Sequence, residues 1–168
     1  MQRYTIAVLV RNQFGVLNRV TSMFRRRQFN IDCLTVSETE SPDYSRITVQ
    51  FDGEEATKKQ LVSQLYKLPD VCSIKELRGD NTVSRELLLI KLKNDPKLQD
   101  DLRASGEFFD VKVVDYTRDA VILQMTGKSR RIDDFLHLMR DYTILEICRT
   151  GVVSLERGNT TIRKVTNL

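Results

Sequence analysis

The residues best suited to chemistry lie where the first apolar run of the chain ends, around Asn12 and Gly15. The strand-like run Val8-Leu9-Val10 precedes them, and an amphipathic helix begins with Val16 and Leu17. The start of a helix presents unpaired N–H groups and the positive end of a dipole, which together suit a carboxylate. No nucleophile, base or metal-ligand set stands near this turn. The pattern therefore predicts a receptor for a small acid, not a catalytic centre.

The turn allows two interpretations. In the structural one, Gly15 only permits a tight connection and Asn12 caps the helix. In the functional one, backbone N–H groups of Gly15 and Val16 bind a carboxylate, and the Asn12 amide contacts a ligand carboxylate or ammonium. The neighbouring side chains of Val16, Leu17 and Ile31 would suit a branched aliphatic ligand.

The remaining chemistry-bearing residues are scattered. Asn30 is either a left-handed helix stop or a second polar contact that reaches the site of a neighbouring chain. His137, the single histidine, has no cysteine or carboxylate at a useful spacing, so we expect a packing or surface role. Cys33, Cys72 and Cys148 are odd in number and widely spaced, which predicts buried, reduced thiols and no zinc site. Catalytic residues and metal ligands are therefore not predicted.

The elements that position the turn follow from hydrophobic periodicity. The first half of the chain has the order β-α-β-β-α-β, which predicts a four-stranded antiparallel sheet with both helices on one face. The other face must be solvated or paired with something. The predicted strands are residues 4–10, 31–37, 45–51 and 71–77, and the predicted helices follow Gly15 and surround Leu61, Leu65 and Leu68.

The order recurs after a polar linker at residues 78–82. Strands are predicted over 85–93, 111–116, 120–126 and 144–155, with a short helix through 95–102 and a second helix capped by Ser129. The prediction is an α+β protein of two tandem ferredoxin-like βαββαβ domains, at 1–78 and 83–158, followed by a polar, frayed tail at 159–168. A chain ending near residue 80 should then still fold.

Composition limits the class of protein. The chain has 168 residues and a net charge of +4, and its tight basic run, Arg25-Arg26-Arg27, fits a solvated helix end better than a nucleic-acid surface. Thin cores of small domains favour pairing with another chain. The chain shows no signal-peptide pattern and no run long enough to cross a membrane. We expect a cytoplasmic oligomer that binds neither nucleic acid nor membrane.

The stretch from Asn12 to Val20, together with the stretch from Phe24 to Val36, closely resembles the N-terminal ACT domain of the small regulatory subunit of acetohydroxyacid (acetolactate) synthase. The pattern there is roughly N-x-x-G-x-L-x-R-[VI], followed by a helix that leads into N-I-x-x-L-T-V. Further matching pieces lie at 45–48, 64–71, 84–87 and 149–153, so the resemblance covers nearly the whole chain.

The resemblance implies a non-catalytic subunit with an ACT-like C-terminal domain. Such subunits bind and activate a large catalytic subunit, which holds thiamine diphosphate, FAD and magnesium. They also confer feedback inhibition by valine, often with leucine or isoleucine, in branched-chain amino acid biosynthesis. The effector lies at a homodimer interface, so Asn12, Gly15, Val16 and Leu17 would come from one chain, and Asn30 and Ile31 from the other.

Two departures from the family pattern bear on the effector. Phe14 stands where many members have a small residue, and Cys33 replaces a serine. Two other classes of function compete with the regulatory subunit. One is a free-standing ACT-type sensor that regulates another enzyme or transcription. A regulator of transcription would need a DNA-binding helix or a basic patch. A small ferredoxin-like enzyme would need a polar constellation that His137 does not provide.

Overall fold

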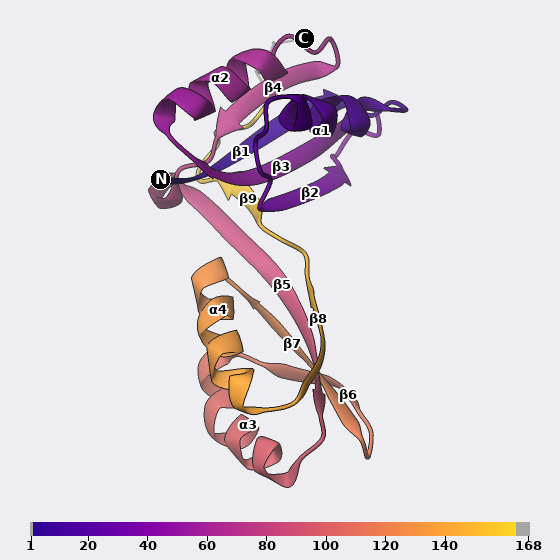
Figure 1. Cartoon of the computed structure of the whole chain (residues 1–168), viewed down its shortest axis with the longest axis vertical. Coiled ribbons are helices and arrows are strands. Elements are labelled where there is room, and N and C mark those ends of the chain that lie inside the picture. The colour runs from indigo at the N-terminus through magenta and orange to yellow at the C-terminus, as the bar shows by residue number, and fades with distance from the viewer. Residues whose placement is uncertain (1, 164–168) are drawn as a thin grey trace. The chain divides into compact units, whose positions relative to one another are not determined.

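The computed structural model describes residues 2–163, without the side chains of residues 103–107. These residues form two compact units. The first unit holds residues 2–83 and 152–163, and the second holds residues 84–151. Each unit is an antiparallel sheet covered by two helices on one face, as the sequence predicts (Figure 1).

The first unit follows the order β-α-β-β-α-β. Its sheet has the strand order β2-β3-β1-β4, with every neighbouring pair antiparallel. The elements are β1 (Gln2–Arg11), α1 (Val16–Arg26), β2 (Cys33–Glu38), β3 (Tyr44–Gly53), α2 (Glu55–Leu65) and β4 (Val71–Glu76). A single turn of 3-10 helix, η1 (Gly79–Asn81), follows β4.

Alternation along β1 explains why the two helices cover one face of this sheet. Ile6 and Val8 point to the same side because side chains alternate along a strand. They pack in one core with Val20 and Phe24 of α1 and Leu61 of α2, all at most 1% exposed. Val20 and Phe24 are four residues apart, which places them on one side of α1. The predicted helical stripe therefore forms the inner face of α1.

The opposite face of the sheet is covered as well. Ala7 and Leu9 alternate with the core residues of β1 and are 0% and 3% exposed, and Thr48 on β3 is 3% exposed. Val152 and Ser154, from near the other end of the chain, are equally buried and belong to the same unit. From the sequence this face could be either solvated or paired, and in the structure the chain itself covers it.

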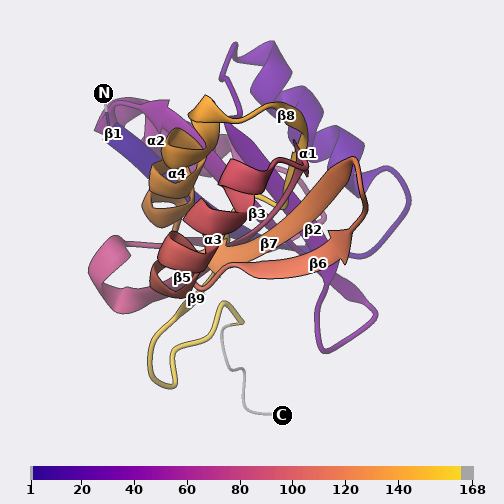
Figure 2. The ribbon, with the colours of Figure 1, turned by 90° about the horizontal axis from the view of Figure 1, so that it is seen from below.

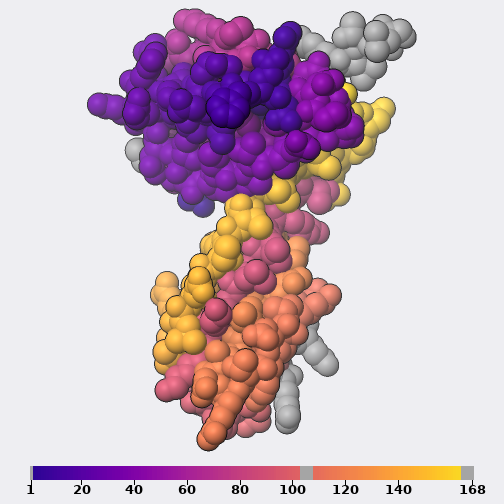
Figure 3. All heavy atoms as spheres, turned by 90° about the vertical axis from the view of Figure 1, so that its right-hand side faces the viewer, coloured from indigo at the N-terminus to yellow at the C-terminus, as the bar shows by residue number. Residues whose placement is uncertain are grey.

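Polar contacts fix this returning segment, residues 152–163, to the first unit. The Arg46 side chain on β3 donates a hydrogen bond from Nη2 to the carbonyl oxygen of Ser154 at 2.7 Å. The Lys75 ammonium on β4 forms an ion pair with Glu156. In Figure 3 the yellow atoms of this segment lie directly against the first unit. The segment is therefore a third layer of that unit.

The second unit repeats the plan. In Figure 2 its helices α3 and α4 lie side by side over one face of the sheet, whose strand order is β6-β7-β5-β8, with β9 (Val153–Glu156) paired to β5 as a fifth strand. Its elements are β5 (Thr82–Lys93, starting in the first unit), α3 (Pro96–Phe109), β6 (Lys112–Tyr116), β7 (Ala120–Gly127), α4 (Ser129–Leu138), η2 (Met139–Asp141) and β8 (Ile144–Arg149). A separate core packs between sheet and helices.

Several predicted boundaries of the second half differ from the structure. The strand predicted over 144–155 is two strands, β8 and β9 (Val153–Glu156), because Gly151 has a φ of 77° and turns the chain between them. The helix predicted over 95–102 continues to Phe109. The predicted second domain spans residues 83–158; in the structure residues 152–158 group with the first unit, while β9 within them pairs with β5. Of the predicted frayed tail, residues 164–168 lie outside the described residues.

Ser129 does not cap α4, so that prediction was wrong. The N-cap is Lys128, and Ser129 is the first helical residue. The Ser129 hydroxyl instead hydrogen-bonds to Glu86, a carboxylate on β5 that is only 4% exposed and that also pairs with Arg149. Leaving a buried carboxylate without donors costs more free energy than leaving a helix start without an acceptor. The Ser129 hydroxyl therefore bonds to Glu86 and does not cap α4.

Candidate functional site

The turn between β1 and α1 has the conformation that a glycine is needed for. Gly15 is the N-cap of α1, with φ 78° and ψ −3°, in the left-handed region that other residues rarely adopt. A glycine N-cap has no side chain that could accept a hydrogen bond from the first turn of the helix. The Val16 N–H already donates to the carbonyl oxygen of Gln13 at 3.3 Å, so an anion at this exposed turn would meet the N–H groups of the next residues of α1.

Asn12 is positioned by the loop after β2. Its Nδ2 donates to the carbonyl oxygen of Pro42 at 2.9 Å and to Oε1 of Glu38 at 3.2 Å, and its backbone N–H donates to the carbonyl oxygen of Asp43. Asn12 does not cap α1, because Gly15 occupies that position. Both side-chain contacts use the amide nitrogen as donor, so the oxygen of this exposed side chain is oriented by the loop.

The apolar residues of the turn are divided between core and surface. Val16 is 3% exposed as a whole residue, packs in the core and donates its backbone N–H to the carbonyl oxygen of Gln13, so only a small part of it can reach a ligand. Leu17 is 42% exposed, and Phe14 is fully exposed. An apolar ligand side chain at this turn would therefore meet Leu17 and Phe14.

Asn30 and Ile31 lie beyond the far end of α1. The Asn30 amide donates to the carboxylate of Asp32 at 2.9 Å, and Ile31 is half-buried against the core. The predicted left-handed helix stop is not Asn30 but Gln28, whose φ is 56°. The 11 residues of α1 separate the two ends of the helix by about 16 Å, at 1.5 Å per residue. Within one chain, Asn30 and Gly15 are too far apart to hold one small amino acid.

Arg19 is a charged neighbour of the turn that the sequence analysis did not single out. Its Nε and Nη2 donate to the Asp70 carboxylate at 2.9 and 2.7 Å, and its Nη1 lies 3.7 Å from where a Cβ on Gly15 would stand. Asp70 is 51 positions away in sequence, so no local pattern pairs it with Arg19. Asp70 balances the charge of this guanidinium, and the Nη1 group beside Gly15 is a further donor for an anionic ligand.

The other candidates carry no site. Arg25 and Arg26 are exposed in the last turn of α1, where cations complement the helix dipole. Cys72 and Cys148 are exposed and Cys33 is half-buried, so the prediction of buried thiols was wrong for two of them. His137 is exposed on α4. Among the described residues no cluster of histidine, cysteine and carboxylate side chains could hold a metal, and no helix is long and apolar enough to cross a membrane.

Comparison with known proteins gives one consistent result. Residues 85–158 match the family described as the small subunit of acetolactate synthase, and residues 6–73 match the AHAS small subunit-like ACT domain. The probable acetolactate synthase small subunit of Archaeoglobus fulgidus is 41% identical, over 94% of this chain and 98% of its own length. The acetolactate synthase isozyme 3 small subunit of Escherichia coli is 37% identical, over 96% of this chain and 99% of its own length.

A solved structure agrees with the sequence relatives. The crystal structure of the acetolactate synthase small subunit from Thermotoga maritima superposes with a TM-score of 0.87 at 33% identity, covering 95% of this chain and all of that one. Family, relatives and fold therefore point the same way.

Proposed function

The chain belongs to the acetolactate synthase small-subunit family, and we propose that it binds and activates a catalytic large subunit. It would also impose feedback inhibition by a branched-chain amino acid, with valine as the first candidate. The relatives named as small subunits support a partner subunit. The chain itself then carries no active site, and the large subunit would hold the thiamine diphosphate, FAD and magnesium. The three free cysteines fit action in the cytoplasm.

The effector site of this proposal is shared by two chains. Asn12, Gly15, Val16 and Leu17 of one protomer would contact the amino acid, together with Asn30 and Ile31 of the partner subunit. The observation that carries this is the separation along α1, because the two groups of residues lie at opposite ends of an 11-residue helix. Only a second chain can bring both groups to one small ligand, so the proposal includes a homodimer.

The turn supplies a plausible role for each part of an amino acid. The effector carboxylate would accept hydrogen bonds from the first N–H groups of α1, with Nη1 of Arg19 as a further donor. The Asn12 side-chain oxygen would accept from the effector ammonium. Leu17, 42% exposed, would contact an aliphatic side chain. Occupation of a shared site biases the geometry of the dimer, and an effector inhibits by preferring the inhibitory arrangement.

The test is reconstitution with the catalytic subunit and an assay of pyruvate conversion, with and without valine. Gly15→Asp forces a branched, charged side chain into a left-handed position beside the proposed carboxylate, so we expect valine inhibition to weaken about tenfold or more. Activation of the catalytic subunit should persist. The matched control is Gly79→Asp, at an exposed glycine of η1 with nothing within 4 Å of its added Cβ, which should leave both properties unchanged.

Two results would contradict different parts of the proposal. Unchanged valine inhibition in Gly15→Asp would show that the effector site lies elsewhere. A wild-type chain that neither raises the activity of the catalytic subunit nor binds it would overturn the regulatory role itself.

A further inference from the structure

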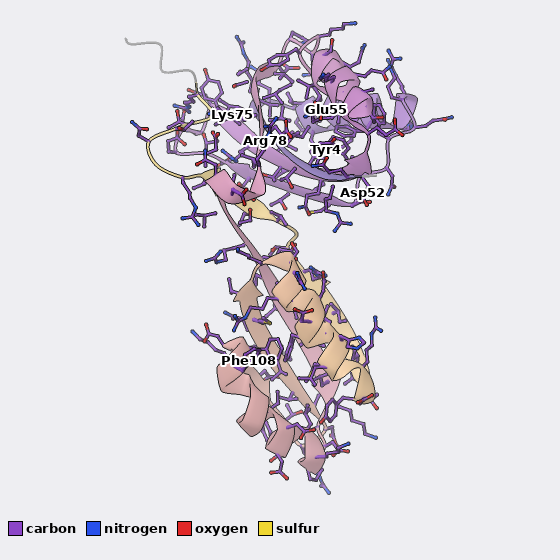
Figure 4. The ribbon with its side chains drawn as sticks, turned by 90° about the vertical axis from the view of Figure 1, so that its left-hand side faces the viewer. Tyr4, Asp52, Glu55, Lys75, Arg78 and Phe108 are labelled. Atoms are coloured by element: carbon purple, nitrogen blue, oxygen red, sulfur yellow. The ribbon has the colours of Figure 1, made fainter. Side chains whose placement is uncertain are left out.

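The second unit contains a cavity that the proposed function does not use. It has a volume of about 750 Å³ and lies where the end of α3, the end of β7 and the start of α4 meet. The residues that matter for its chemistry are Phe108, Arg85, Gly127, Lys128, Arg130 and Arg131. Figure 4 shows Phe108 at the end of α3 in this unit. The cavity lies wholly within residues 84–151, so it is independent of the effector turn.

The charge of the lining is positive. Among the lining residues that the structure describes, the four cations Arg85, Lys128, Arg130 and Arg131 stand against two carboxylates, which is an excess of two positive charges. Arg85 donates to the backbone carbonyl oxygen of Ser84. In the part of the chain that the structure describes, Arg85, Lys128 and Arg130 form no ion pair. These cations are therefore available to an outside anion.

The position of the cations argues against a purely structural role. Lys128 is the N-cap of α4, and Arg130 and Arg131 lie in its first turn, which has no acidic residue. The positive end of a helix dipole is unfavourable for cations, which stabilise a helix at its other end. Ser129 does not relieve this arrangement, because its hydroxyl bonds to Glu86. An anion bound in the cavity would relieve the repulsion among the cations and with the helix dipole.

An aromatic wall stands beside the cations. The Phe108 ring is 71% exposed although it is a large apolar side chain. The Arg131 guanidinium lies 5.5 Å from its ring centroid and 5.9 Å from that of Phe109, and its Nη2 also bonds to the carbonyl oxygen of Phe108. These contacts hold Arg131 in place while leaving most of the Phe108 ring open. A ligand with a flat apolar part could therefore pack on Phe108 while its charge meets the cations.

We propose that this cavity is a second binding site, for a small organic phosphate that joins a dianionic phosphate group to a planar ring. The phosphate would lie among Lys128, Arg130 and Arg85, and the ring against Phe108. Arginine suits this task because its planar guanidinium donates two hydrogen bonds to one phosphate. This proposal concerns a ligand and a unit that the branched-chain effector does not touch.

The test is an NMR titration of the isotope-labelled full-length chain with two probes, inorganic phosphate and phenyl phosphate. Both should shift the backbone amide signals of residues 127–131 in a saturable way at millimolar concentration, with phenyl phosphate binding more tightly. Arg130→Ala should weaken both probes about tenfold, as expected for loss of a charge-assisted hydrogen bond. Phe108→Ala should abolish only the advantage of phenyl phosphate over phosphate.

The matched control is Arg118→Ala, which removes one exposed positive charge from the same unit outside the cavity. It should leave both affinities unchanged. Equal weakening by Arg118→Ala and Arg130→Ala would show that the probes respond to overall charge, and the proposal would be wrong. It would also be wrong if neither probe shifted residues 127–131 at up to about 20 mM and low salt. Equal binding of both probes in the wild type would rule out the ring contact with Phe108.

Discussion

Lys58 is a buried cation that joins three elements of the first unit. It is 5% exposed, and its ammonium pairs with Glu55 on α2 at 2.8 Å and with Glu76 on β4 at 2.7 Å. It also lies 5.0 Å from the ring centroid of Tyr4, whose hydroxyl bonds to Glu55 (Figure 4). The hydrogen bonds that Lys58 donates to Glu55 and Glu76 raise the pKa of Lys58. The charge is therefore fully compensated, and removing it leaves two carboxylates without their shared partner.

Replacement of this lysine tests that compensation. Lys58→Met keeps the length of the side chain but removes the charge, and we expect the free energy of unfolding to fall by about 2 kcal/mol. The adjacent Lys59→Met is the control, because the Lys59 ammonium is exposed and lies as far as 4.0 Å from the Glu55 carboxylate. This variant should lower the free energy of unfolding by less than about 0.5 kcal/mol. Urea unfolding at neutral pH measures both. Similar values for the two variants would mean that Lys58 contributes no more than a surface charge.

The same residues predict acid sensitivity. The hydrogen bond from Lys58 lowers the pKa of Glu55. At Glu76 burial raises the pKa, but the hydrogen bonds and charges of Lys58 and Arg78 together outweigh burial, so the pKa of Glu76 is lowered as well. A carboxylate whose pKa is lowered by folding stabilises the fold when the pH is above its pKa in the unfolded chain. This contribution disappears as the pH falls through the pKa of the folded state. The free energy of unfolding should therefore decrease below about pH 4.5, and less steeply in Glu76→Gln. An unchanged slope in that variant would contradict the assignment.

At the scale of elements, the sequence predicts what depends on near neighbours. Alternation in β1 and the four-residue spacing of Val20 and Phe24 identify strand and helix, and the order of elements then identifies the fold, which the structure confirms. Gly15 marks a turn that needs a left-handed residue, and the structure has one there. Whether the turn binds an effector stays a prediction, because that depends on a second chain.

Features that depend on distant residues were missed. Ser129 has the sequence of a helix cap, yet its hydroxyl bonds to Glu86, which is 43 positions away. Arg19 beside Gly15 is held by Asp70, and no periodicity links them. Gly151 lies within a predicted strand, but its φ of 77° ends that strand, and the chain continues from Val152 in the other unit. In each case a tertiary contact outweighs a local preference, which single-sequence patterns do not contain.

At the scale of the whole molecule, the first unit is built from two distant stretches of the chain. Residues 2–83 supply the sheet and helices, and residues 152–163 cover the sheet face that carries Ala7 and Leu9. The sequence predicts that a chain ending near residue 80 still folds, with this face either solvated or paired with something. The structure instead predicts that such a fragment exposes apolar sheet surface.

Truncation at the other end tests this dependence. A chain that ends at Gly151 keeps both sets of strands and helices but loses β9, and we expect the first unit to lose at least about 2 kcal/mol, the value of burying one valine-sized side chain. A chain that ends at Arg157 retains β9 with Ser154 and Glu156 and serves as the control. Hydrogen exchange at the amides of β1 measures the difference. Equal protection of β1 in both chains would show that β9 contributes nothing to the first unit.

The returning segment also sets a delay in biosynthesis. A ribosome adds about 5–20 residues per second, so the roughly 70 residues between Val83 and Val152 take about 4–14 s to make. During that interval the nascent first unit has its helices and strands but not the cover of its second sheet face. Chaperones, proteases and other nascent chains can meet that uncovered face until translation passes β9. Completion of the first unit therefore waits for translation of residues 152–163.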